Sequence, residues 1–179
     1  MQRIQVRHQG GDEIKTVILG IGNILLRDEG VGVHAVASLG ELYEFPPHVE
    51  LLDGGTMGLD LLPFVEGAEN LLIVDAAELG EEPGTVRLLE GSDISSFLDM
   101  KFSVHQIGLP DMLFAAELMD ISPRRLAMVG VQPQDMGTGT ELSETLSNAM
   151  GDVLHSVIEK LSAWGVAPSR RSHVPGHTL

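Results

Sequence analysis

The sequence predicts an α/β fold in a single domain, with an open, mostly parallel twisted sheet of about five strands and helices on both faces. Short apolar runs with β-branched residues alternate with helical patterns along the 179 residues. Parallel strands need crossover connections and burial on both faces, so this alternation favours a parallel sheet between two helical layers. One antiparallel edge strand remains an open alternative. The length and the 43% hydrophobic content suit one domain with a substantial core, and two full domains are not expected.

Four segments are predicted as buried strands because each is short, apolar and rich in β-branched side chains. A fifth segment is more polar and is therefore predicted as an edge strand. The buried strands are expected at residues 15–19, 49–53, 70–76 and 126–131, and the edge strand at residues 85–90.

Helical patterns separate these strands. Residues 28–42 place Gly32, Ala35, Val36 and Leu39 on one face at the i, i+3, i+4, i+7 spacing. Asp28 is interpreted as the N-cap of this helix, because its side chain can accept from the first free backbone N–H groups. Further helices are expected at residues 59–66, 110–119 and 141–164, the last with one apolar stripe along its length.

The two ends of the chain are predicted to lie outside the domain. Residues 1–14 are expected to be a loose N-terminal extension and residues 166–179 a flexible tail, because both are polar; the tail is also rich in Pro, Ser and Arg. The domain is then residues 15–165. No apolar run reaches the roughly 7 residues of a secretory signal or the roughly 18 of a membrane helix, so neither export nor membrane insertion is expected.

The charge and the absence of cysteine exclude several classes of function. The chain has 11 basic and 26 acidic side chains and a net charge of −15, which opposes binding to nucleic acid or to anionic membranes. With no cysteine, the chain has no disulfide, no thiolate nucleophile and no sulfur ligand for a metal. Any metal must be held by oxygen and imidazole nitrogen. A cytoplasmic location is the expectation that fits this composition.

Acidic residues follow three of the predicted strands. The first strand leads into the glycine-rich run GIGNILLRDEGVG, which contains Asp28 and Glu29, while the second ends at Asp53 and the third at Asp75. The carboxyl ends of parallel strands lie on one rim of a sheet, which is where open α/β proteins bind ligands. His105 precedes the helix at 110–119 and is expected on the same rim.

These side chains suggest a metal site. A buried, ionised carboxylate such as Asp75 costs several kcal/mol without a partner, and a cation would offset that cost. Glu29, Asp75 and His105 are the predicted ligands, because two carboxylates and one imidazole leave positions open for water or substrate. The ligand types do not distinguish zinc, nickel, manganese and cobalt.

Each residue also has a simpler interpretation, which the sequence leaves open. Asp53 can close an Asx-turn before the two glycines that follow it. Asp75 can act as an N-cap or accept backbone hydrogen bonds. A single histidine such as His105 is more often a surface or satisfied core residue than a ligand. The joint placement of the residues favours the metal site.

Familiar catalytic and nucleotide-binding motifs are missing. The dinucleotide pattern G-x-G-x-x-G fails because Leu25 stands where the third glycine is required. The sequence also has no P-loop, no G-x-S-x-G nucleophile elbow and no H-E-x-x-H zinc motif.

Four motifs in a fixed order resemble a known family. GIGNILLRDEGVGV, LLDGGT, LLIVDA and SVHQIGL, spread over about residues 15–165, closely resemble the maturation endopeptidases of nickel-iron hydrogenases. The resemblance implies removal of a C-terminal extension from the hydrogenase large-subunit precursor after nickel insertion. It implies that Glu29, Asp75 and His105 bind nickel, which would arrive with the precursor, and that other divalent metals can replace it in the isolated protein.

The resemblance leaves the chemistry open. Either nickel polarises the scissile carbonyl or activates water, or it serves only for docking and an Asp or Glu acts as general base in aspartyl-type proteolysis. Glu29, Asp75 and His105 are therefore also the candidate catalytic residues. A nickel carrier without hydrolysis is the main alternative, and a peptidyl-tRNA hydrolase is disfavoured by the net charge of −15. The residues expected to position the substrate are Asp53, Gly54, Gly55 and Thr56.

Overall fold

The predicted sheet is present, with four parallel strands and one antiparallel edge strand. The computed structural model describes residues 14–94 and 108–172. Its five-stranded sheet has the order β3-β1-β4-β6-β5, in which β5 alone runs antiparallel to its neighbour. The prediction of an edge strand at 85–90 is confirmed. The strands are β1 (Thr16–Ile21), β3 (Val49–Gly55), β4 (Asn70–Ala76), β5 (Val86–Glu90) and β6 (Arg125–Val131).

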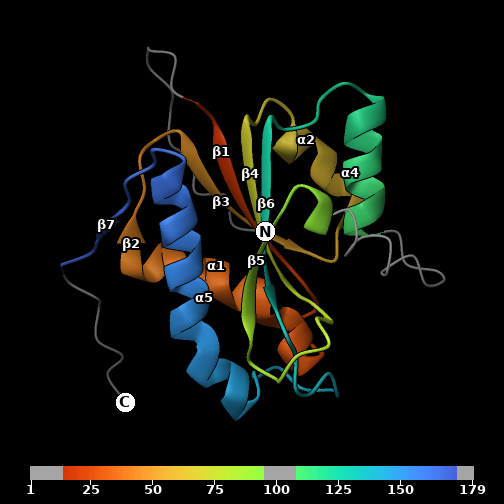
Figure 1. The fold of residues 1–179 in the computed structure, drawn as a ribbon, viewed down its shortest axis with the longest axis vertical. Coiled ribbons are helices and arrows are strands. Elements are labelled where there is room, and N and C mark those ends of the chain that lie inside the picture. The colour runs from red at the N-terminus through yellow and green to blue at the C-terminus, as the bar shows by residue number, and fades with distance from the viewer. Residues whose placement is uncertain (1–13, 95–107, 173–179) are drawn as a thin grey trace.

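Helices cover both faces of this sheet (Figure 1). On one face lie α1 (Val31–Leu42) and α5 (Glu144–Ala163), and on the other lie η2 (Gly58–Leu61), α2 (Leu62–Val65) and α4 (Leu109–Leu118). Successive strand residues point to opposite faces. In β1, Ile18 therefore packs with α1 and α5, whereas Val17 and Leu19 pack with α2 and α4. No helix of the described residues is long and apolar enough to cross a membrane.

The helix expected at 110–119 is observed as α4, shifted by one residue, and the other three predicted helices differ more from the structure at their ends. The segment expected to begin the first helix forms a separate 3-10 turn, η1 (Arg27–Gly30), before α1 starts. The helix expected at 59–66 is divided between η2 and the single turn of α2. The last helix begins three residues later than expected, because Ser143 caps it: its Oγ accepts a hydrogen bond from the Leu146 N–H at 3.2 Å.

The packed part of the chain continues past residue 165. Val166 is buried, and β7 (Ser169–Arg170) pairs with β2 (Tyr43–Glu44) in a small antiparallel sheet. The Arg171 N–H also donates to the Leu42 carbonyl at 2.9 Å. Described contacts with the sheet-bearing part of the chain thus reach Arg171, and the domain boundary expected at 165 stays a prediction. Residues 1–13 and 173–179, which include most of the predicted extension and half of the tail, lie outside the described residues.

The strand order fixes where a ligand site belongs. From the interior strand β1 the chain moves to β3 on one side and then returns to β4 on the other side of β1. In doubly wound sheets, the crevice at such a reversal opens beyond the carboxyl ends of the two strands involved. A ligand site is therefore expected at the carboxyl ends of β1 and β4.

Candidate functional site

Glu29 and Asp75 both come from elements at this reversal of strand order. Asp75 is the last residue but one of β4 and is only 3% exposed. Glu29 is half-buried in η1, which follows β1 and contacts β4. The structure thus brings together the elements that carry two of the three predicted metal ligands. The third, His105, lies outside the described residues.

Glycines allow η1 and α1 to press against the strand ends. A Cβ atom at Gly32 would lie 2.1 Å from the Val74 carbonyl oxygen and 2.4 Å from that of Ile21. At Gly22, whose φ is +134°, a Cβ would lie 1.7 Å from the Glu29 carbonyl oxygen. Side chains cannot fit at either position. The glycine-rich run therefore serves close backbone packing that sets Glu29 beside the end of β1.

The carboxylate of Glu29 has the properties expected of a cation ligand. Its Oε2 atom is buried and has no hydrogen-bond partner among the described residues. A buried carboxylate oxygen without a partner is costly, and a metal ion would satisfy it. Two carboxylates and an imidazole are a suitable donor set for a divalent transition metal. Within residues 14–94 and 108–172 no three His, Asp or Glu side chains form a metal-binding group, so the complete set would require His105.

The segment predicted to position the substrate lies on the same rim. Asp53 pairs with Gly20 in the register of β3 and β1, and the Gly22 N–H donates to the Gly55 carbonyl at 3.0 Å. Asp53 Oδ1 accepts from the Gly55 N–H at 3.1 Å, which is the Asx-turn considered as its simpler interpretation. Asp53 and Thr56 are exposed, while Gly54 is buried. Their role in substrate binding stays a prediction.

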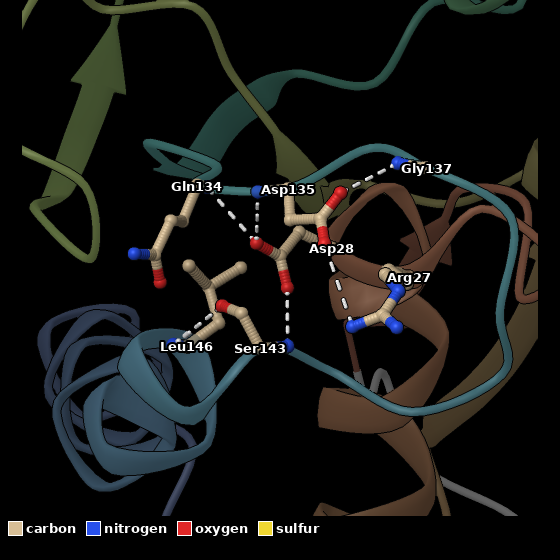
Figure 2. A network of polar contacts seen from close by, with 7 residues as sticks. All are labelled: Arg27, Asp28, Gln134, Asp135, Gly137, Ser143 and Leu146. Carbon is tan, nitrogen blue, oxygen red and sulfur yellow. Dashed lines mark hydrogen bonds and ion pairs between the residues drawn. The ribbon is translucent and has the colours of Figure 1, made fainter.

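Asp28 is not the N-cap of α1, so that prediction was wrong. The N-cap position belongs to Gly30 and has no side-chain hydrogen bond. The Asp28 side chain is fully buried and points to the loop after β6 (Figure 2). Its Oδ2 accepts from the N–H groups of Gln134 at 2.9 Å and Asp135 at 2.8 Å, and its Oδ1 accepts from that of Ser143 at 2.7 Å. Asp28 lies within the 3-10 turn η1, two residues before the N-cap Gly30, and this position explains the error.

The loop after β6, residues 132–143, contacts η1, and the sequence did not predict this contact. Besides the bonds to Asp28, the Arg27 N–H donates to the Gly139 carbonyl at 2.9 Å and the Asp28 N–H to the Asp135 carbonyl at 3.1 Å. Arg27 Nη1 lies 3.4 Å from Asp135 Oδ2, so the basic side chain of Arg27, two positions before Glu29, forms an ion pair with this loop (Figure 2). Arg27 adopts a left-handed backbone with φ of 47°, which is rare outside glycine. No local pattern in the sequence indicates that the segment returns to η1.

Hydrogen bonds determine the acidity of Asp28. Burial acts to raise the pKa of its carboxyl, but the three backbone N–H groups of Ser143, Asp135 and Gln134 hold that pKa below its usual value of 3.8. A carboxyl whose pKa is lower in the folded state stabilises the fold at pH values above its unfolded pKa. That stability is lost as the pH falls through the folded pKa.

Acid is therefore expected to unfold the protein partly through Asp28. The free energy of unfolding should be insensitive to this group near neutral pH and should fall once the pH drops below about 4, where the unfolded state binds the extra proton. Urea unfolding of the wild type and of Asp28→Asn at pH 7 and pH 3 measures this. The loss between the two pH values should be smaller in the variant, and equal losses would contradict the assigned role of the carboxylate.

Comparison with known proteins gives a consistent result. A family model described as hydrogenase maturation protease matches residues 33–160. The hydrogenase expression/formation protein HupD of Rhodobacter capsulatus is 38% identical over 154 residues, which are 85% of this chain and 73% of that protein. The hydrogenase 2 maturation protease of Escherichia coli is 36% identical over 86% of this chain and 94% of its own length.

Solved structures agree with the sequence comparisons. The hydrogenase maturating endopeptidase HybD from Escherichia coli superposes with a TM-score of 0.83 at 36% identity, covering 88% of this chain and 98% of that one. A maturation protease HybD from Thermococcus kodakarensis has a TM-score of 0.64 at 24% identity, which shows the same fold. The arrangement of the sheet and its helices is therefore shared across these proteins.

Proposed function

The chain belongs to the hydrogenase maturation protease family, and from that premise we propose that it cleaves the C-terminal extension from the nickel-loaded large-subunit precursor of a nickel-iron hydrogenase. Nickel is part of the substrate in this proposal, because the precursor brings it. The reaction is hydrolysis of one peptide bond, in which water adds to the carbonyl carbon and the C–N bond breaks. We place the reaction in the cytoplasm, a reducing compartment that suits a chain without cysteine.

The main support for nickel recognition is the buried Oε2 atom of Glu29, which has no hydrogen-bond partner within the described residues. Within the described residues this buried oxygen lacks a hydrogen-bond donor, and it belongs to an element that contacts the strand bearing Asp75. Both carboxylates lie at the carboxyl rim of the sheet, where a bound precursor could reach them. We propose that Glu29, Asp75 and His105 are the three groups that contact nickel. The Asp53 turn and the backbone of Gly54 and Gly55 would lie along the same rim and position the peptide.

Three ligands from the enzyme suit a metal that another protein already holds. Nickel in the precursor must keep its own ligands while it engages the protease, so an incomplete set on the enzyme is what shared binding requires. Nickel bound in this way can polarise a carbonyl oxygen or lower the pKa of a water molecule. A carboxylate that is not engaged with the metal can instead remove a proton from the attacking water.

Cleavage of two forms of the precursor tests this function. The pure protein is incubated with nickel-loaded and with nickel-free large-subunit precursor, and the masses of the products are measured. We expect a C-terminal peptide and a shortened precursor from the loaded form alone. Equal cleavage of both forms would contradict nickel recognition. An intact, nickel-bound precursor in a complex with this protein would instead support a carrier that does not hydrolyse peptide bonds.

A further inference from the structure

The buried carboxylate of Asp28 lies next to the proposed nickel ligand but takes no part in the function proposed above. Asp28 and Glu29 are neighbours in η1, a turn of four residues. Asp28 is fully buried, and both of its oxygens accept backbone N–H groups from the loop after β6. Each of its partners lies more than 100 positions away along the chain. Asp28 is therefore a tertiary contact that joins two distant segments.

Glu29 is held between this contact and the end of β1. On one side its carbonyl oxygen lies so close to Gly22 that a Cβ atom there would approach it to 1.7 Å. On the other side the adjacent Asp28 is tied to the loop by its side chain and by its own N–H, which donates to the Asp135 carbonyl at 3.1 Å. A shift of the loop would move η1, and Glu29 would move with it. The half-buried Glu29 side chain has no hydrogen bond at Oε2 within the described residues that could hold it in place independently.

We propose that Asp28 is a positioning residue, which fixes the Glu29 carboxylate for recognition of the nickel-loaded precursor by binding the N–H groups of Gln134, Asp135 and Ser143. This inference rests on the function proposed above. Asp28 itself does not contact nickel or the peptide in this proposal, because both of its carboxylate oxygens are bound by residues of the loop after β6. Ligands must be held within a fraction of an ångström to act, and hydrogen bonds from surrounding groups supply that precision.

Ser143 offers a way to perturb this contact from the donor side. Its N–H donates to Asp28 Oδ1, whereas its hydroxyl separately caps α5 by accepting from Leu146 N–H. Its φ of −57° is one that proline adopts, so Ser143→Pro demands no new backbone angle at this residue. The variant removes the N–H and puts a ring carbon in its place, which displaces the Asp28 Oδ1 atom that lies 2.7 Å from the Ser143 nitrogen. Ser143→Ala loses the same cap and the side-chain contact of Ser143 with Asp28, but it keeps the N–H that donates to Asp28 Oδ1. The two variants therefore differ in the hydrogen bond to Asp28.

The experiment measures kcat and KM for cleavage of nickel-loaded precursor by the wild type, Asp28→Asn, Ser143→Pro and Ser143→Ala. All are assayed at a temperature where circular dichroism shows them folded. A variant that is only less stable contains less active enzyme, so its apparent kcat falls while its KM is unchanged. Misplacement of Glu29 instead weakens recognition, and we expect KM to rise by about tenfold or more in Asp28→Asn and by about threefold or more in Ser143→Pro. Ser143→Ala keeps the N–H and should therefore raise KM less than Ser143→Pro does.

The outcomes separate this inference from the proposed function. If the wild type does not cleave the loaded precursor, the proposed function fails. If the wild type cleaves it and folded Asp28→Asn has an unchanged KM, the positioning role of Asp28 is overturned. A KM in Ser143→Ala raised as far as in Ser143→Pro would also overturn it, because the loss would then follow the helix cap. If Asp28→Asn does not fold, the KM of Ser143→Pro is compared with that of Ser143→Ala, and only a higher KM in Ser143→Pro supports the positioning role of Asp28.

Discussion

Replacement of Asp75 by Asn is expected to lower the rate of precursor cleavage by about 10²–10³-fold, the scale seen when one group that stabilises the transition state is lost. Asparagine keeps the shape of the side chain but removes its charge and its ability to donate an anionic oxygen to nickel. Asp75 is 3% exposed at the end of β4, so its replacement changes one buried side chain on the rim. Single-turnover cleavage of nickel-loaded precursor measures the loss. Asp75→Ala and His105→Ala are expected to abolish processing in the same way.

A matched variant controls for the change of charge. Asp152→Asn makes the same chemical change at an exposed position on α5 and should cleave within about twofold of the wild type, as surface substitutions usually do little. Circular dichroism must show that Asp75→Asn and His105→Ala remain folded. Normal cleavage by a folded variant of Asp75 or His105 would remove that residue from the site.

The second large effect concerns stability. Gly22→Ala is expected to destabilise the fold by about 4 kcal/mol or more, because the new Cβ would lie 1.7 Å from the Glu29 carbonyl oxygen at a φ of +134°. The turn η1 cannot move away without breaking the hydrogen bonds that tie Asp28 to the loop after β6. Urea unfolding followed by circular dichroism measures the change in the free energy of unfolding.

Gly151 supplies the control for this substitution. It lies in the exposed part of α5, and a Cβ there would meet no atom within 4 Å. Gly151→Ala should therefore stabilise the protein by about 0.5–1 kcal/mol, the difference in helix propensity between the two residues. If Gly22→Ala were as stable as the wild type, the close approach of Glu29 to the end of β1 would not exist as described.

The fold could be predicted because its signals are local. The strand expected at 70–76 is observed as Asn70–Ala76, since a continuous apolar run with β-branched residues is buried on both faces. The polar segment at 85–90 was expected at an edge and lies there as β5, antiparallel to β6. The placement of Glu29 and Asp75 on one rim followed from the rule for the carboxyl ends of parallel strands.

The role of Asp28 could not be predicted, because its partners are distant in the sequence. The carboxylate binds N–H groups 106, 107 and 115 positions away, and no periodicity or spacing encodes such a contact. An acidic residue before a helix was interpreted as its N-cap, which is the usual local meaning of that position. The pairing of β7 with β2 is likewise a contact between distant segments. The polar segment after residue 165 has no local strand pattern, and β7 forms only through its pairing with β2.

The central claim is that this protein contacts the nickel of its substrate, and X-ray absorption at the nickel edge tests it most directly. Nickel-loaded precursor is measured alone and after rapid mixing and freezing with the protein. We predict that the complex adds oxygen and nitrogen neighbours to nickel at about 2.0–2.2 Å, the range of carboxylate and imidazole ligands at zinc. Mixing with Asp75→Asn should add fewer of them. A nickel environment that is the same with and without the wild-type protein would contradict the account.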